Sequence, residues 1–336
     1  MNFGYSDTCL RHDTGRRHPE TADRLRAIRE VLSRKHGVAY VEPDPIDREL
    51  ATAIHDDDYV DEFRSFCEDG GGEWDPDTVA VPATWDAALQ SAGLARWAAE
   101  RALAGDDGRD TPFALGRPPG HHAVGDDAMG FCFLNNVAIA AQWALDAGAA
   151  ERVAIVDWDV HHGNGTADVF AARDDVLFCS LHEQGIYPGT GAVNEVGEGA
   201  GEGRTVNVPL PAGAGDPEYD AALERAVEPA LGAFDPDLLL VSAGFDAHRH
   251  DPISRMTVST EGYGHMTTRL RDAAGRSDAP IGFVLEGGYS LEVLAEGVAM
   301  VHEVFDGYDP IAPDEAVDDA VAELLDDLVA EHPLLS

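Results

Sequence analysis

Lysine is almost absent from this 336-residue sequence: Lys35 is the only lysine, and every other basic side chain is an arginine. Acidic side chains outnumber basic ones by 63 to 23, so the formal net charge is −40. Binding to nucleic acid requires a patch of clustered basic side chains, which a chain so poor in cations does not readily form. We therefore expect no direct binding to nucleic acid.

The excess carboxylates are spread along the whole chain instead of being gathered in one acidic tail, as residues 56–58 and 326–327 illustrate. Repulsion among so many like charges destabilises a compact state at low salt. At ~1 M ionic strength the Debye length falls to about 3 Å, and most of that repulsion is screened. The composition therefore predicts a halophilic protein.

Long apolar runs, paired cysteines and internal repeats are also missing. No stretch reaches the roughly 18 consecutive apolar residues of a membrane-spanning helix, so no membrane span is expected. The N-terminus lacks the basic segment and apolar core of a secretory signal. The four cysteines stand far apart without CxxC spacing, which argues against disulfides and against a cysteine-ligated zinc site. A reduced, cytoplasmic protein is the expectation, and its oligomeric state stays open.

The sequence does contain short apolar runs that alternate with helical stretches. Four β-branched runs predict buried strands, at residues 153–156, 176–180, 238–242 and 281–285. Helical spacing occupies residues 136–147, 219–231 and 262–274. This alternation predicts an α/β fold with a central, mostly parallel sheet covered on both faces. We expect one domain over residues 1–312, with residues 313–336 forming an acidic C-terminal helix that packs on it.

Polar clusters directly follow three of the predicted strands. Asp157, Asp159 and His161 follow the first strand, Asp246 follows the third, and Tyr289 follows the fourth. Ligands bind outside the carboxyl ends of the strands in such a sheet, so these side chains should converge on one crevice.

Asp159, His161 and Asp246 would form a set of two carboxylates and one imidazole. Three protein ligands leave a position open for water, as in catalytic metal sites. The mixture of oxygen and nitrogen ligands suits zinc, and also iron(II) or cobalt. An Asp-x-His triplet alone fits a hydrogen-bonded strand end equally well, so that alternative stays open.

Two adjacent histidines, His121 and His122, follow the rigid segment Arg117-Pro-Pro-Gly. Neighbouring imidazoles can serve as a general acid and a general base when their hydrogen-bond partners differ. The alternative is a pair of solvated loop histidines without a catalytic role.

Six segments together resemble the histone deacetylase superfamily, which also contains acetylpolyamine amidohydrolases and acetoin-utilisation proteins. They are Arg-Pro-Pro-Gly-His-His-Ala from Arg117, Gly-Phe-Cys-Phe-Leu-Asn from Gly130, Asp-Trp-Asp-Val-His-His-Gly-Asn-Gly from Asp157, Tyr-Pro-Gly-Thr-Gly from Tyr187, Ser-Ala-Gly-Phe-Asp from Ser242 and Glu-Gly-Gly-Tyr from Glu286. The resemblance extends in the same order from His18 to Tyr289, over nearly the whole chain. It implies a three-layer, arginase-like fold and a metal-dependent amidohydrolase that removes acetyl groups from linear amides.

The resemblance also implies a role for each motif residue. Asp159, His161 and Asp246 match the zinc ligands, and Tyr289 matches the tyrosine that donates to the substrate carbonyl. His122 matches the general base on the attacking water and His121 its electrostatic or acid partner.

Two further positions match residues that act on these histidines. Asp157 matches the carboxylate that orients His121. Asn164 stands where the first class of histone deacetylases has an aspartate, so this chain looks like the second class and its bacterial relatives. An amide there should leave His122 less strongly cationic.

The resemblance also extends to the walls of the site and to a second ion. Phe131 and Tyr187, with Gly130 beside them and Ile253 as a third contact, match the lining of a narrow substrate tunnel; core packing is the alternative for both aromatics. Arg24 resembles an arginine near an acetate exit path. A structural potassium site would comprise five residues: Asp157, Asp159, His161, Ser180 and Leu181.

The expected function is zinc-dependent removal of the acetyl group from acetyl-lysine in proteins or from a small acetylated amine. An acetylpolyamine amidohydrolase is the main alternative. An arginase-like hydrolase with two manganese ions would need further carboxylates where His121 and His122 stand. A binding module without activity should lack a metal ligand or Tyr289, and the sequence has all of them.

Overall fold

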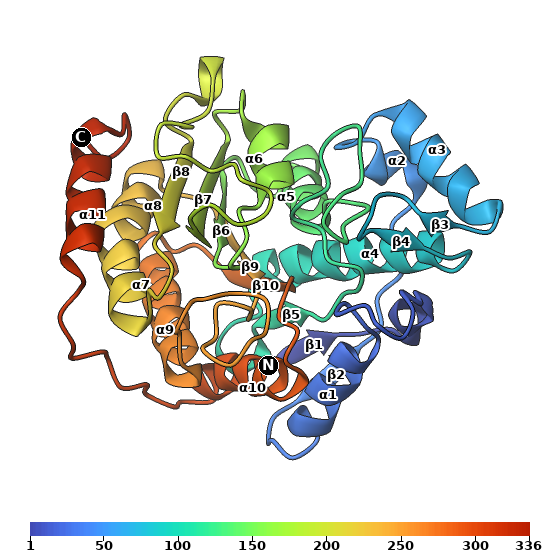
Figure 1. Ribbon diagram of the computed structural model, residues 1–336, viewed down its shortest axis with the longest axis horizontal. Helices are drawn as coiled ribbons and strands as arrows, with labels where there is room; N and C mark the ends of the chain where they lie inside the picture. Colours follow the sequence, from blue (N-terminus) through green and yellow to red (C-terminus); the bar gives the residue numbers. More distant parts are fainter.

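The computed structural model describes all residues, 1–336, and it is organised around one sheet of eight parallel strands (Figure 1). The strand order is β2-β1-β5-β10-β9-β6-β7-β8. The strands are β1 (Asn2–Gly4), β2 (Ala39–Val41), β5 (Pro112–Ala114), β6 (Val153–Asp157), β7 (Val176–Glu183), β8 (Thr205–Leu210), β9 (Leu238–Ala243) and β10 (Ile281–Leu285). A separate antiparallel pair is formed by β3 (Gly72–Glu73) and β4 (Val79–Ala80).

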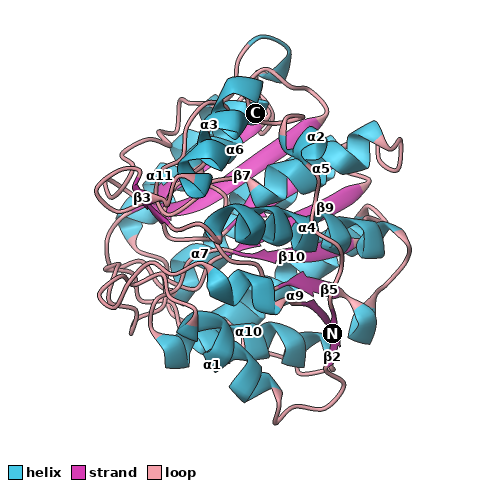
Figure 2. Cartoon of the chain, turned by 90° about the vertical axis from the view of Figure 1, so that its right-hand side faces the viewer, coloured by secondary structure: helices cyan, strands magenta, loops and turns pink.

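Helices cover both faces of the sheet, so the strands lie between two helical layers (Figure 2). One layer contains α4 (Thr84–Leu103), α5 (Asn136–Asp146) and α6 (Asn164–Phe170), with α2 (Arg48–Ala51) and α3 (Asp57–Glu68) beside it. The other contains α1 (Asp23–Leu32), α7 (Asp216–Ala222), α8 (Glu228–Phe234), α9 (Thr260–Arg276), α10 (Leu291–Phe305) and α11 (Asp319–Glu331).

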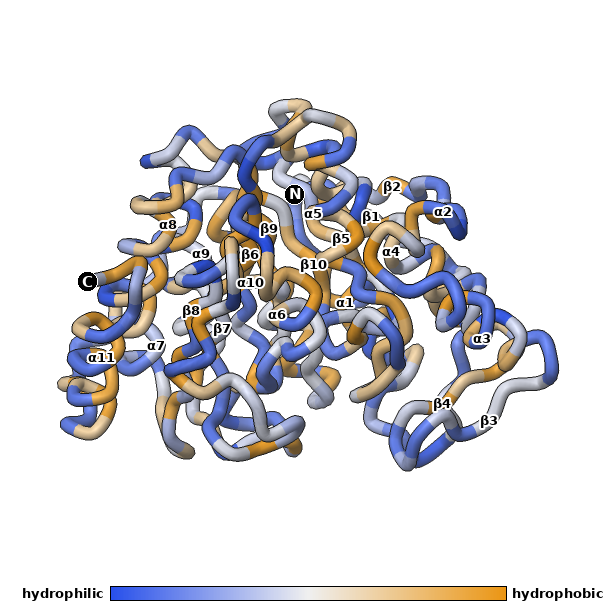
Figure 3. Tube along the Cα trace, turned by 90° about the horizontal axis from the view of Figure 1, so that it is seen from above, coloured by the Kyte–Doolittle hydropathy of each residue, from blue (hydrophilic) through white to orange (hydrophobic).

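Alternate residues of a strand point to opposite faces, which explains why each strand is apolar throughout. In β6, Ala154 and Val156 belong to the core on one face, whereas Val153 and Ile155 belong to the core on the other. Figure 3 shows orange, hydrophobic stretches among the central strands. The expected α/β fold with a parallel sheet is confirmed.

The order of the strands locates the crevice. From β6 the chain proceeds outward through β7 to β8, then returns to the other side of β6 with β9 and β10. The carboxyl end of β6 is therefore a switch point, flanked by loops that run in opposite directions, where ligands bind in such sheets. Asp157 ends β6 and is in register with Ser180 of β7 and Ser242 of β9.

The structure corrects two boundaries. The helix expected at residues 219–231 is divided into α7, a π-helical turn at Leu223–Val227, and α8, whose first turn contains Pro229. A proline cannot donate the next helical hydrogen bond, so the register changes before it. The C-terminal helix begins at Asp319, where the Asp318 side chain accepts from the Ala320 N–H.

That helix, α11, contacts the domain through polar groups as well as apolar ones. Arg225 pairs with Asp326, and His332 hydrogen-bonds the carbonyl of Thr205 in β8 (2.8 Å). The division at residue 312 stays a prediction. None of the helices combines the length and the apolar character needed to cross a bilayer.

Candidate active site

Asp159, His161 and Asp246 come together at the carboxyl ends of β6 and β9. The Nδ1 atom of His161 lies 3.0 Å from Asp159 Oδ1 and 3.4 Å from Asp246 Oδ2. Ligand bonds of about 2.0–2.1 Å in a tetrahedral zinc site place neighbouring ligand atoms about 3.3 Å apart. These two distances match that spacing, and the ligand atoms of all three residues lie within 4.8 Å of one another.

The hydrogen bonds around these carboxylates also fit a metal. Asp246 Oδ1 accepts from the Val160 N–H (2.9 Å), and Asp159 Oδ2 accepts from the Gly287 N–H (2.7 Å). Asp246 Oδ2 is buried and has no hydrogen-bond partner. A buried carboxylate oxygen without a partner is unfavourable, and a cation bound between Asp159, His161 and Asp246 would satisfy it.

Two glycines allow the backbone to approach the carboxylates. A Cβ atom on Gly244 would lie 2.1 Å from Asp159 Oδ2, and one on Gly287 would lie 2.1 Å from Asp246 Oδ2. Any larger residue would displace a candidate metal ligand, so the glycines of the Ala-Gly-Phe-Asp and Glu-Gly-Gly-Tyr segments have a steric reason.

His121 is paired with a carboxylate. Its Nδ1 lies 2.9 Å from Asp157 Oδ2, and its Nε2 lies 3.8 Å from Asp159 Oδ1. Burial opposes the charged imidazolium, but the charges of Asp157 and Asp159 outweigh it and raise the pKa of His121 to about 10. His121 is therefore arranged to carry a proton.

His122 has the opposite character although it is the next residue. Burial and the charges of His121 and His161 lower the pKa of His122 well below its usual value. Its Nδ1 lies 2.7 Å from Asn164 Oδ1, an oxygen that can only accept, so Nδ1 carries the hydrogen. The lone pair is then on Nε2, which leaves that nitrogen free to accept a proton.

Aromatic rings contact His122 and Tyr289. Tyr187 meets His122 edge-on with ring centroids 5.1 Å apart, and Phe131 meets Tyr289 edge-on at 5.8 Å. A Cβ atom on Gly130 would lie 2.5 Å from the His122 ring, so only glycine fits there. Ile253 is half-buried, and its place in the tunnel stays a prediction.

Arg24 lies under the loop that carries Tyr289. It is fully buried, donates to the carbonyls of Gly288 (Nε, 2.8 Å) and Glu286, and pairs with Glu20 at 3.2 Å. Its guanidinium carbon is 5.2 Å from the centroid of the Tyr289 ring. These contacts make Arg24 a support of that loop, and its link to an acetate path stays a prediction.

The five residues expected around potassium are contiguous in the fold. Asp157, Asp159 and His161 leave the end of β6, while Ser180 and Leu181 belong to the adjacent strand β7. The Ser180 hydroxyl oxygen lies 3.0 Å from His182 Nδ1. The site itself stays a prediction.

Several supporting residues were not singled out from the sequence. Glu286 is buried, and its Oε2 accepts from the N–H groups of Gly120 (2.8 Å) and His121 (3.3 Å), which holds the histidine loop. The Thr78 hydroxyl accepts from the Phe131 N–H (3.1 Å). The Glu-Gly-Gly-Tyr motif was a signal for Glu286, whereas nothing in the sequence distinguishes Thr78.

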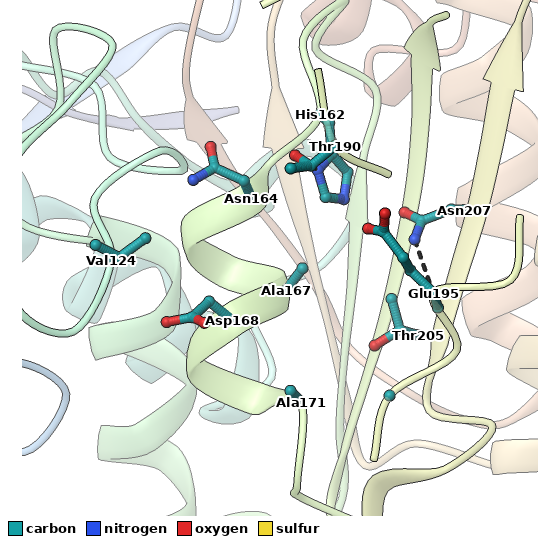
Figure 4. A pocket seen from close by; sticks show the side chains of 11 residues that line it. Val124, His162, Asn164, Ala167, Asp168, Ala171, Thr190, Glu195, Thr205 and Asn207 are labelled. Atoms are coloured by element: carbon teal, nitrogen blue, oxygen red, sulfur yellow. Dashed lines mark hydrogen bonds between the residues drawn. The ribbon is translucent and has the colours of Figure 1, made fainter. Parts of the chain in front are cut away.

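His162 illustrates how adjacent histidines can serve different purposes. Its Nδ1 lies 2.8 Å from the Thr190 hydroxyl oxygen, and its ring lines a cavity of about 290 Å³ together with Asn164 and Asn207 (Figure 4). Asn164 belongs to the lining of this cavity, and none of the candidate metal ligands does.

Comparison with known proteins agrees with this geometry. A family model described as the histone deacetylase domain matches residues 18–305. The chain is 42% identical to an uncharacterised protein of Synechocystis sp., over 88% of this chain and 95% of the relative. It is 40% identical to a histone deacetylase-like amidohydrolase of Pseudomonas aeruginosa, over 85% of this chain and 76% of the relative.

A solved structure shows the same fold. The crystal structure of the HDA15 HD domain superposes with a TM-score of 0.89 at 37% identity, covering all of this chain and 98% of that one. The fold and the site define a hydrolytic deacetylase. The chain belongs to the histone deacetylase family.

Proposed function

We propose that this protein is a zinc-dependent deacetylase that hydrolyses the acetyl amide of acetyl-lysine or of a small acetylated amine. The observation that carries the proposal is the contrast between His121 and His122. Asp157 and Asp159 raise the pKa of the first, whereas burial and neighbouring charge lower that of the second. An acid and a base thus lie side by side next to a set of metal ligands.

Hydrolysis of an amide needs an activated water, a stabilised oxyanion and a proton for the leaving amine. Asp159, His161 and Asp246 would hold a zinc ion, which would supply Lewis-acid activation of the water and of the carbonyl. His122 Nε2 accepts the proton of the attacking water. The Tyr289 hydroxyl donates to the carbonyl oxygen as negative charge develops on it.

The leaving amine cannot depart as an anion, so it must receive a proton. His121 supplies that proton, because the adjacent Asp157 carboxylate favours its charged form. Asp157 holds the ring through Nδ1 (2.9 Å) and stabilises the charged form. Phe131 and Tyr187 guide the alkyl chain of the substrate, and Arg24 lies beside the path by which acetate leaves.

The mouth of the site favours a cationic substrate. Burial and Cys132 raise the pKa of Tyr187, and the charges of Asp77, Asp75 and Asp127 raise it further. These carboxylates therefore lie close enough to the tunnel wall to attract a lysine-rich peptide or a polyamine, although high salt screens much of that attraction. An acetylpolyamine substrate is the second candidate on this observation.

Two further assignments belong to the proposal. All four cysteines are buried and free, which is compatible with a reduced, cytoplasmic protein. A structural potassium ion between β6 and β7 would be readily supplied by a salty cytoplasm, with Asp157, Asp159, His161, Ser180 and Leu181 as its surroundings.

The deciding experiment compares substrates and metals on one preparation. The chelated protein is reloaded with zinc, iron(II) or cobalt in concentrated KCl, and hydrolysis of an acetyl-lysine peptide and of acetylspermidine is measured with metal content. We expect zinc at one equivalent to restore turnover of the peptide. Preference for acetylspermidine would favour the second candidate, and binding of both without hydrolysis would favour a module without activity.

A further inference from the structure

The backbone that presents Tyr289 has no regular structure, since it follows β10 as the segment Gly287-Gly288-Tyr289-Ser290. Gly288 has φ +114°, a conformation that an L side chain rarely adopts. Such a segment does not hold its shape through a hydrogen-bond ladder. The position of the Tyr289 hydroxyl must therefore be fixed by side chains from elsewhere in the fold.

One carboxylate outside the candidate metal-binding set accepts from two of the four N–H groups of this segment. Asp251 Oδ2 accepts from the N–H of Tyr289 (2.6 Å) and from the N–H of Ser290 (2.9 Å). Its Oδ1 accepts from the N–H of Ile253 (3.1 Å). Asp251 is 7% exposed, and no basic side chain pairs with it, so its charge is stabilised mainly by these three N–H groups.

The geometry points to Asp251 as the residue that positions Tyr289 for catalysis. The N–H of Tyr289 and the N–H of Ser290 belong to the two peptide planes on either side of the Tyr289 Cα atom. A single oxygen that accepts from both fixes both planes, and with them the direction in which the phenol leaves the backbone. This inference rests on the proposed role of Tyr289 as donor to the substrate carbonyl.

The same carboxylate joins the segment that carries Tyr289 to the loop that contains Ile253. Its second oxygen accepts from the N–H of Ile253. Asp251 therefore holds the loop between β9 and α9 and the loop after β10 in a fixed relative position. A displacement of about 1 Å in a reacting group can lower a rate about 10²-fold. Positioning by Asp251 is therefore expected to affect turnover more than substrate binding.

Asparagine is an informative replacement because it keeps the shape and changes the donors. Both oxygens of Asp251 accept, whereas an amide has one acceptor and one NH2 donor. In either orientation the NH2 group of Asp251→Asn faces a backbone N–H, so either the Tyr289 side or the Ile253 side is released. The orientation that keeps two N–H bonds would release Ile253, and Asp251→Ala removes both sides.

The test is a double-mutant cycle with Asp251→Ala, Tyr289→Phe and the double variant, all loaded with zinc. We expect Asp251→Ala to lower kcat about 10- to 100-fold with a much smaller change in KM. In the Tyr289→Phe background the same change should lower kcat less than about 3-fold, because the hydroxyl to be positioned is gone. Equal losses in both backgrounds would overturn the inference.

A matched control separates positioning from stability. Asp216 also fixes a loop, since its Oδ1 accepts from the Ser259 N–H (2.7 Å) and its Oδ2 from the Ser259 hydroxyl (2.5 Å). Asp216→Ala should leave kcat nearly unchanged when assayed below its melting temperature. If Asp251→Ala does not fold, Asp251→Glu replaces it in the cycle, because the longer side chain shifts both accepting oxygens, and the same loss of additivity is expected.

Hydrogen exchange gives a readout that does not require activity. The amides of Tyr289 and Ser290 should exchange faster in Asp251→Ala than in the parent, while those near Ser259 stay protected. If the parent hydrolyses no acetylated amine, the proposed function fails, yet exchange still decides whether Asp251 holds the loop. Unchanged exchange at Tyr289, or faster exchange with unchanged kcat in an active enzyme, would overturn the inference.

Discussion

Carboxylates serve two different purposes in the interior and on the surface of this molecule. Several are buried, and each accepts from specific donors or belongs to the candidate metal site: Glu20, Asp157, Asp159, Asp246, Asp251 and Glu286. Most of the others are exposed, like Asp58 and Asp327. Buried carboxylates thus make specific interactions with one partner or one site, whereas exposed carboxylates act mainly through their summed charge.

Burial determines how strongly a charged pair interacts and how much it contributes to stability. Burial opposes ionisation of Glu20, but Arg117 at 2.6 Å and Arg24 at 3.2 Å outweigh it and lower its pKa to about 2. An exposed pair such as Arg64 with Glu68, at 2.7 Å, has a similar distance but is screened by solvent. Such exposed pairs contribute little to stability.

The largest effect should follow from removing a buried carboxylate of the candidate metal site. Asp246→Ala should abolish stoichiometric metal binding and lower turnover about 10³-fold, since a Lewis acid supplies several kcal/mol of transition-state stabilisation. Metal content and kcat check this outcome. Asp327→Ala, an exposed change of the same chemistry, should alter neither, and full activity of Asp246→Ala would remove it from the ligand set.

The next effect concerns stability. Glu20→Gln leaves two fully buried guanidinium groups, those of Arg24 and Arg117, without their carboxylate. Breaking a buried ion pair by removing one partner destabilises a protein by about 3–5 kcal/mol. Denaturant unfolding in concentrated salt should show a loss of this size. A loss no larger than that of an exposed change such as Glu68→Gln would contradict the distinction between interior and surface.

The candidate site could be assembled from the sequence because its residues follow strands directly. Asp157, Asp159 and His161 leave β6, and Asp246 leaves β9, so the parallel-sheet rule alone brings them to one edge. The family resemblance then assigned roles to the histidines and to Tyr289. The strands that supply this edge are long enough for their apolar character to be recognised.

Other features could not be predicted, for physical reasons. The strands β1, β2 and β5 have three residues each, too few for a periodic pattern. Asp251 acts by accepting from backbone N–H groups, a role that gives no sequence pattern among 63 acidic residues. The π-helical turn before Pro229 depends on tertiary packing as well as on the proline.

A buried histidine offers a pH test of the interior. His55 Nδ1 donates to the Val124 carbonyl (2.8 Å), and its Nε2 accepts from the Asn135 N–H (2.9 Å). Burial lowers its pKa to about 4 from 6.5, although hydrogen bonds to backbone carbonyls oppose the shift. The unfolded chain therefore binds the proton more tightly than the folded one does.

Because the unfolded chain binds this proton more tightly, lowering the pH destabilises the folded state. The stability contributed by His55 is complete above about pH 6.5 and is lost as the pH falls toward about 4, by at most about 3 kcal/mol. His55→Gln should be less stable at pH 7 and should show a shallower loss of unfolding free energy between pH 6.5 and 4. The exposed His36→Gln should keep the parent slope, and an unchanged slope in His55→Gln would contradict the assignment.

The smallest effect per residue is expected from surface carboxylates. A variant that neutralises four of them tests whether they act through their summed charge. Neutralising Asp56, Asp58, Asp174 and Asp327 as asparagines reduces like-charge repulsion, which is strong at low salt and screened within about 3 Å at 1 M. The melting temperature should rise by about 1–3 °C at low salt and change less in concentrated KCl.

The effect of changing the buried Glu20 should not depend on salt, unlike the effect of changing surface carboxylates. Its partners Arg24 and Arg117 lie where neither water nor salt penetrates, since all three side chains are fully buried. The destabilisation by Glu20→Gln should therefore be nearly the same at low and high salt, measured as the difference in unfolding free energy from the parent. A quadruple surface variant that loses stability at low salt would refute repulsion among surface carboxylates as a source of instability at low salt.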